Sequence, residues 1–162
     1  MNGIQFVYCN HTMLKRMKNI LVAVELDQFD EQIIEKAAQF GLAFNSKIWL
    51  VHIAAPEPDF VGYTVGPQYI RDSRAEELKN EHKVLQELSS VLKNMGVNAE
   101  GLLIQGATIE MIIEESKKLE VDLIITGHHD RGFLYKALRG SVSSQIIKLS
   151  KIPILIVPYG NP

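Results

Sequence analysis

Short apolar runs rich in β-branched residues recur along the chain, and longer stretches with helical spacing of their apolar residues separate them. Such runs are typical of central strands covered on both faces, and a helix between two of them returns the chain for parallel pairing. The sequence therefore predicts an α/β domain with one doubly wound, parallel, five-stranded sheet and helices on both faces. The predicted strands are 19–25, 47–53, 97–104, 121–126 and 153–157.

The stretches between the strands predict amphipathic helices. The first has Asp27 as its expected N-cap, acidic Asp30 and Glu31 in its first turn, and Gly41 or Asn45 as its end. The second spans 71–95 and the third 108–119. One side of the second helix carries Ala75, Leu78, His82, Leu85, Leu88 and Leu92. The third strand contains polar residues and glycine, so we expect it at an edge of the sheet.

The segment after the fourth strand carries most of the functional information. Gly127 is expected to end that strand, a loop with His128 and His129 follows, and Gly140-Ser141 opens a helix. A helix start with free backbone N–H groups and hydroxyls is a natural anion site, although Gly-Ser is also a common plain cap. In open parallel sheets, ligands bind beyond the carboxyl ends of the strands where the winding reverses.

Composition limits the classes of protein to consider. A chain of 162 residues is long enough for one domain with a sizeable core. Its 17 basic and 19 acidic residues give no electrostatic reason to expect nucleic-acid binding or a membrane surface. The single cysteine, Cys9, excludes an intrachain disulfide and fits a reducing compartment. We therefore expect a soluble, cytoplasmic protein.

Residues 1–16 hold only a four-residue apolar run, too short for a signal-peptide core or a membrane span. We interpret them as a loosely held N-terminal extension, because Met17 begins a plausible first strand. The domain itself is expected to comprise residues 17–162.

Five blocks of sequence, in order, carry a resemblance to a known family. They are ILVAVE, VHI, GATIEMII, VDLIITGHH and GSVSSQIIKLSKIPILIV. Together they resemble the universal stress protein family over residues 18–158. The resemblance implies a Rossmann-like sheet with strand order 3-2-1-4-5 and an adenine nucleotide, such as ATP, ADP or AMP, with or without Mg²⁺.

The resemblance also implies a set of binding residues. Glu25 matches an acid that accepts hydrogen bonds from the adenosine moiety, and it could otherwise cap the adjacent helix. Ala23 and Val24 would border the adenine, Ile53 would pack on it, and Thr126 would lie with Gly127 beneath the ribose and phosphates. The phosphate cradle would consist of Gly140, Ser141, Val142 and Ser143, which offer N–H and hydroxyl groups.

One position departs from the family's pattern, G-x2-G-x9-G-[S/T]. Gly127 and Gly140-Ser141 match it, but Asp130 stands where the middle glycine is expected. A carboxylate about 4 Å from a phosphate charge would cost about 4 kcal/mol at an effective dielectric near 20. Gly132 could supply the missing flexibility, and a bridging Mg²⁺ could turn the repulsion into attraction.

Catalytic alternatives find little support. The sequence has no G-x4-G-K-[S/T] and no G-x-G-x-x-G after the first strand, and no nucleophile-base set with a supporting context. Adjacent His128 and His129 point in different directions, so a solvated pair is favoured over a metal site. We expect no efficient catalysis, and at most slow hydrolysis of bound ATP.

The resulting interpretation is a homodimeric stress-response sensor or regulator that binds an adenine nucleotide and needs neither nucleic acid nor membrane. The resemblance implies dimerisation through the last strand, from Pro153 to Val157. The main alternative is a dimeric scaffold that has lost nucleotide binding through Asp130. A small enzyme that uses the loop with His128, His129 and Asp130 is a third alternative.

Overall fold

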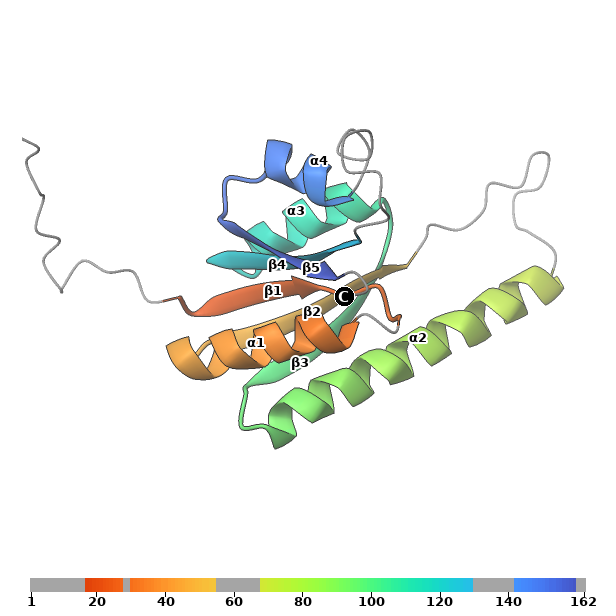
Figure 1. The fold of residues 1–162 in the computed structure, drawn as a ribbon. Helices are drawn as coiled ribbons and strands as arrows, with labels where there is room; N and C mark the ends of the chain where they lie inside the picture. The colour runs from red at the N-terminus through yellow and green to blue at the C-terminus, as the bar shows by residue number, and fades with distance from the viewer. Residues whose placement is uncertain (1–16, 28–29, 55–67, 130–141, 160–162) are drawn as a thin grey trace, which may run out of the picture.

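A computed structural model describes residues 17–27, 30–54, 68–129 and 142–159 (Figure 1). Its strands form one parallel five-stranded sheet in the order β3-β2-β1-β4-β5. The fold class and strand order expected from the sequence are confirmed, and β3 lies at an edge as predicted. The strands are β1 (Asn19–Ala23), β2 (Lys47–Ala54), β3 (Ala99–Gln105), β4 (Leu123–His129) and β5 (Ile154–Tyr159).

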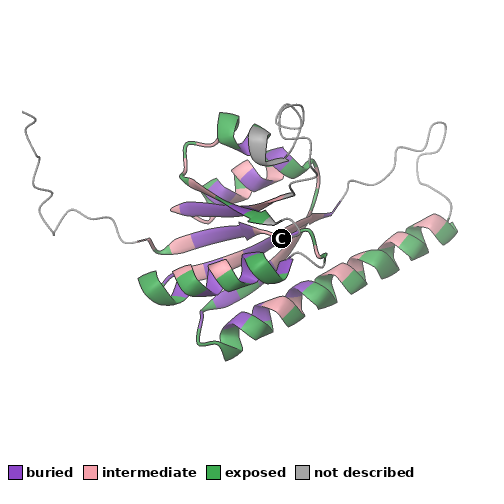
Figure 2. Ribbon diagram, viewed as in Figure 1, coloured by how far each residue is buried: buried purple, intermediate pink, exposed green. Residues whose placement is uncertain are grey.

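Helices cover both faces of this sheet. On one face lie α1 (Asp30–Phe44) and α2 (Gln68–Asn94), and on the other lie α3 (Thr108–Lys118) and α4 (Val142–Leu149) (Figure 1). Successive residues of β1 point to opposite faces, so Ile20 and Val22 join one core cluster and Leu21 joins the other. Figure 2 shows the buried residues concentrated along the strands and on the inner sides of the helices.

The β4 strand is longer than the sequence indicated. Gly127 was expected to end it, but β4 continues to His129. The reason is its neighbour, because Gly127 pairs with Val157 and His128 pairs with Pro158 in β5. A glycine in a strand weakens it without stopping it when a partner strand supplies the ladder. The predicted loop position of His128 and His129 is therefore wrong.

Other boundaries shift by a few residues. β1 ends at Ala23 rather than at residue 25, and α2 begins at Gln68 rather than at residue 71. The α1 helix begins at Asp30 and ends at Phe44, and Asn45 has φ +52°, as expected of a residue that ends a helix. Gly41 lies inside α1. The acidic first turn is confirmed, and the Asp27 cap stays a prediction because residues 28–29 lie outside the described residues.

The α2 helix packs on the sheet only through its second half. Its buried residues are Leu85, Ser89 and Leu92, and Leu85 contacts β3 where Gly101 has no side chain. A Cβ at Gly101 would lie 2.8 Å from Leu85 Cγ, so the glycine permits this close approach. The first half of α2 extends away from the sheet (Figure 1). His82 was predicted on the same side of the helix as Leu85 and Leu92, which are buried, but it is exposed.

No helix within the described residues is both long enough and apolar enough to cross a membrane.

Candidate functional site

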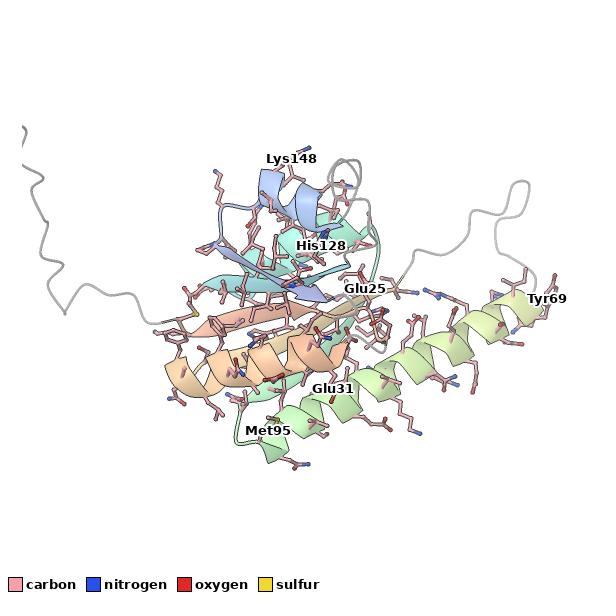
Figure 3. All side chains as sticks on the ribbon, in the orientation of Figure 1. Glu25, Glu31, Tyr69, Met95, His128 and Lys148 are labelled. Atoms are coloured by element: carbon pink, nitrogen blue, oxygen red, sulfur yellow. The ribbon has the colours of Figure 1, made fainter. Side chains whose placement is uncertain are left out.

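An open cavity of about 260 Å³ lies beyond the carboxyl ends of β1, β2 and β4. The sheet order places this cavity where the winding reverses, because β1 has β2 on one side and β4 on the other. Figure 3 labels Glu25 and His128 at this end of the sheet. The lining consists of Ala23, Val24, Glu25, Val51, His52, Ile53, Thr108, Thr126 and Gly127.

Two backbone hydrogen bonds of Val24 hold the part of the cavity wall that follows β1. Its N–H donates to the Val51 carbonyl over 3.0 Å, and its carbonyl lies 2.9 Å from His52 Nδ1. Because a carbonyl only accepts, Nδ1 must carry the proton, and in the neutral ring Nε2 is then an acceptor. His52 is half-buried, and its bond to the Val24 carbonyl holds the chain just before Glu25.

Asp30 holds the turn that follows β1. Its carboxylate is 2% exposed and accepts the N–H groups of Glu25, over 3.2 Å, and Leu26, over 2.7 Å. These bonds support Leu26 at φ +60°, a left-handed conformation that few non-glycine residues adopt. Burial raises the pKa of the Asp30 carboxyl, although the two backbone hydrogen bonds oppose this shift.

Glu25 itself is exposed at the rim of the cavity. Within the described residues its carboxylate makes no hydrogen bond or ion pair, whereas Asp30 makes the contacts that organise this turn. The geometry therefore leaves the Glu25 carboxylate available to a ligand in the cavity.

The β4 side of the cavity is formed by small groups. Thr126 is 4% exposed and pairs with Ala23 across the β1–β4 ladder. Gly127 follows without a side chain, so a ligand can approach the backbone closely at this point.

The amino end of α3 contributes Thr108, which sequence reasoning missed. The cap residue, Ala107, has extended backbone and no side-chain capping bond, so it leaves first-turn N–H groups without a side-chain acceptor. Val51 and His52 also line the cavity without having been predicted as site residues. The available signal for Thr108 was its position two residues after Gly106 at the end of β3, because the carboxyl ends of all parallel strands lie at the same edge of the sheet.

Six of the predicted binding residues lie together around the cavity: Ala23, Val24, Glu25, Ile53, Thr126 and Gly127. Asp130, Gly132, Gly140 and Ser141 lie outside the described residues. Val142 and Ser143 open α4, and the structure describes only their backbone. The phosphate cradle therefore stays a prediction.

The chemistry of the cavity suits binding a small molecule. Apolar side chains from β1 and β2 offer a surface for a flat ring, and the polar groups are few and placed at the edges. No group of three or more His, Cys, Asp or Glu that could hold a metal ion occurs among the described residues. His128 and His129 are consecutive residues of β4.

Comparisons with known proteins agree on one family. Residues 17–158 match the model of the universal stress protein family. The chain is 30% identical over 142 residues to universal stress protein A of Salmonella typhi, covering 87% of this chain and 94% of that protein. It is 29% identical over 142 residues to universal stress protein A of Escherichia coli, with coverage of 87% and 94%.

Two similar solved structures contain nucleotides. One is a universal stress protein in complex with cAMP, with a TM-score of 0.68, 19% identity and coverage of 89% of this chain and 98% of that chain. The other is the universal stress protein from Archaeoglobus fulgidus in complex with dAMP, with a TM-score of 0.59, 17% identity and coverage of 88% and 98%. At these identities the likeness shows the fold.

Proposed function

The chain belongs to the universal stress protein family, and from this premise we propose that it binds an adenine nucleotide and acts as a stress-response sensor or regulator. The observation that carries the proposal is the cavity at the carboxyl ends of β1, β2 and β4. It occupies the position at which open parallel sheets bind ligands, and six residues expected to bind adenosine line it.

Adenine would lie against the apolar wall formed by Ala23, Val24 and Ile53. The ribose would then face Glu25, whose exposed carboxylate can accept hydrogen bonds from hydroxyl groups. The phosphates would extend past Gly127 toward residues 130–143. The adenine nucleotides in the two similar structures, cAMP and dAMP, support this choice of ligand class.

ATP is the proposed physiological ligand, with Mg²⁺ at its phosphates. A divalent cation would offset the charge of Asp130, which replaces the glycine of the family's phosphate motif. Efficient hydrolysis is not expected, because the described cavity holds no nucleophile paired with a base. The proposed role is therefore binding and signalling in the cytoplasm rather than turnover.

The proposed active form is a homodimer that joins through β5. This strand forms an edge of the sheet, and Ile156 on it is 36% exposed. An apolar edge strand with an unpaired ladder favours pairing with another strand. Ligand occupancy would then tune assembly or contacts with partners.

A nucleotide-free dimeric scaffold is the second candidate, and Asp130 is the observation that favours it. The two candidate functions predict different effects of Asp130→Gly on ATP binding. If the scaffold candidate is correct, the native protein does not bind ATP, and the glycine variant gains binding. If the aspartate is tolerated, both proteins bind ATP with affinities within about tenfold, which corresponds to 1.4 kcal/mol.

The test is a calorimetric titration of Mg-ATP into the nucleotide-free native protein, into Asp130→Gly and into Gly140→Glu. We expect micromolar binding by the first two and none by Gly140→Glu, because its carboxylate would fill the phosphate cradle. Size-exclusion chromatography of Gly140→Glu should still give the native elution volume. Binding that survives Gly140→Glu would contradict the proposed placement of the phosphates.

A further inference from the structure

A second concave surface lies on the other side of the β1–α1 turn, between α1 and α2. Its floor is almost entirely apolar, and its volume is about 380 Å³. We call it the α1/α2 groove. Its apolar lining consists of Leu26, Ile34, Val84, Leu88 and Val91, with the acidic residues Asp27, Asp30 and Glu31 at one end.

The apolar surface continues along both helices to the amino edge of the sheet. Leu42 of α1 is 56% exposed and Met95 just beyond α2 is 49% exposed. These positions are close, because a Cβ added at Gly96 would lie 3.9 Å from Leu42 Cδ2. Val91, which also lines the groove, is 48% exposed. Figure 3 labels Glu31 and Met95 toward the two ends of this surface.

An apolar groove of this length on an isolated chain calls for a covering segment. The described chain starts at Met17, which packs against the same core cluster as α1 and α2. The Met17 carbonyl accepts a 2.7 Å hydrogen bond from the Ser46 hydroxyl, and Ser46 follows the end of α1 by two residues. Met17, the first described residue, is therefore held beside the carboxyl end of α1.

The sequence of residues 1–16 complements this surface. Its apolar side chains are Met1, Ile4, Phe6, Val7, Tyr8, Met13 and Leu14, together with Cys9. Its only charged side chains are Lys15 and Arg16, directly before Met17. The last turn of α1 contains no basic residue. Cations are favourable at a helix carboxyl end, so Lys15 and Arg16 would supply the charge that α1 lacks.

Length permits the contact. The part of α1 from Glu31 to Leu42 spans about 17 Å at 1.5 Å per helical residue. Sixteen residues reach about 50 Å when extended and about 24 Å as a helix. The extension can therefore cover the groove in either conformation.

From these observations we infer that residues 1–16 of the chain dock in the α1/α2 groove of the same molecule. The apolar side chains of the extension cover Leu42, Val91 and Met95, and Lys15 and Arg16 lie at the carboxyl end of α1. This surface lies outside the proposed nucleotide cavity, and the inference does not depend on nucleotide binding.

Cys9 makes a direct test possible in the full-length protein, because it is the chain's only cysteine and lies in the extension. A nitroxide attached to Cys9 should broaden the methyl NMR signals of Leu42, Val84 and Val91. The methyl signals of Ile112 and Ile146, on the opposite face of the sheet, should keep their intensity. The reduced nitroxide provides the reference spectrum.

A variant pair then ties the effect to the groove. Val91→Glu places a carboxylate in the exposed apolar surface and should abolish the broadening at Leu42 and Val84. Ser90→Glu adds the same group one residue away, on a side of α2 where Ser90 bonds to the Gln86 carbonyl, and should leave the broadening intact.

A mixed sample distinguishes an extension from the same molecule from one that a second copy of the chain supplies. In it, isotope-labelled protein without nitroxide is combined with unlabelled protein that carries nitroxide at Cys9. Unbroadened groove signals in the mixture, with broadening in the doubly labelled protein, are the expected result. Broadening in the mixture would mean that a second copy supplies the extension, and no broadening in either sample would mean that the groove is uncovered; both outcomes overturn the inference.

Discussion

The carboxylate of Asp30 determines the shape of the turn between β1 and α1. It accepts hydrogen bonds from two backbone N–H groups, those of Glu25 and Leu26. Without Asp30 these two groups would need other acceptors or would lack a hydrogen bond. The same turn places Glu25 at the cavity beyond the carboxyl ends of β1, β2 and β4, and it places Leu26 in the α1/α2 groove. One buried side chain therefore supports both surfaces.

Replacing Asp30 with alanine should destabilise the protein by about 2–3 kcal/mol, because hydrogen bonds to a charged group are worth about 1.5–3 kcal/mol. Urea unfolding followed by circular dichroism measures the loss. Glu31→Ala is the matched control, since Glu31 is an exposed neighbour in the same helical turn and should change stability by no more than about 0.5 kcal/mol. Equal effects of the two substitutions would contradict this role of Asp30.

The pH dependence of this site should run opposite to that of an ordinary paired aspartate. Burial raises the pKa of Asp30 above its usual 3.8, so the folded state holds the proton more tightly than the unfolded state. The part of its stability contribution that depends on proton binding, which is separate from the hydrogen bonds lost in Asp30→Ala, is therefore fully present below the unfolded pKa and is lost as pH rises through the folded pKa. The stability of the native protein relative to Asp30→Asn should fall over this range in urea titrations, and a rise would reverse the sign argued here.

Local sequence patterns could identify the acid at position 30 but not its partners. An acid in the first turn predicts a favourable interaction with the helix dipole, whereas the carboxylate also bonds backward to the turn before the helix. The His52 bond to the Val24 carbonyl joins residues 28 positions apart, and helical or strand periodicity carries no information about such contacts.

Among the elements, α2 divides into a second half that packs on the sheet and a first half without buried residues. Its buried residues all lie between Leu85 and Leu92, and the preceding turns lack a buried residue. A helical segment as short as residues 68–84, without tertiary packing, is only marginally stable in water. The first half should therefore open more readily than the second, and amide hydrogen exchange should be faster there.

Two leucines seven residues apart on α2 test this division. Leu85→Ala should cost about 2–5 kcal/mol, because it empties a fully buried site against Gly101. Leu78→Ala removes the same atoms from the half-exposed part of the helix and should cost less than about 1 kcal/mol. Similar losses in urea unfolding would show that the first half packs as firmly as the second.

Element boundaries were less predictable than elements, and β4 shows why. The sequence around Gly127 contains a strand-breaking residue followed by polar ones, which locally indicates a loop. The strand continues because β5 offers partners for residues 127–129. That pairing depends on the tertiary structure and is absent from the local pattern.

For the whole molecule, the alternation of strands and helices was enough to predict the sheet. Parallel pairing, right-handed crossovers and an edge position for the polar third strand together restrict the topology strongly. The position of the cavity then follows from the point where the winding reverses, whereas the six predicted residues that line it came from the resemblance to the family. Thr108 was missed because it belongs to a helix start rather than a strand end.

The proposed dimer makes a further prediction at this scale. Ile156→Glu should convert the native dimer into a monomer, because it places a charge on the exposed edge strand β5. Multi-angle light scattering after size-exclusion chromatography measures the mass. Lys151→Glu introduces the same side chain just before β5 and should leave the dimer intact. A native monomer, or a dimer that survives Ile156→Glu, would contradict assembly through β5.

The central claim is that this member of the family binds an adenine nucleotide despite Asp130. The most direct measurement denatures the freshly purified native protein and identifies any released nucleotide by chromatography, then titrates the emptied protein with Mg-ATP. The account predicts a recovered adenine nucleotide and micromolar binding. An empty protein that releases no heat on titration would contradict it and would leave the nucleotide-free scaffold as the function to pursue.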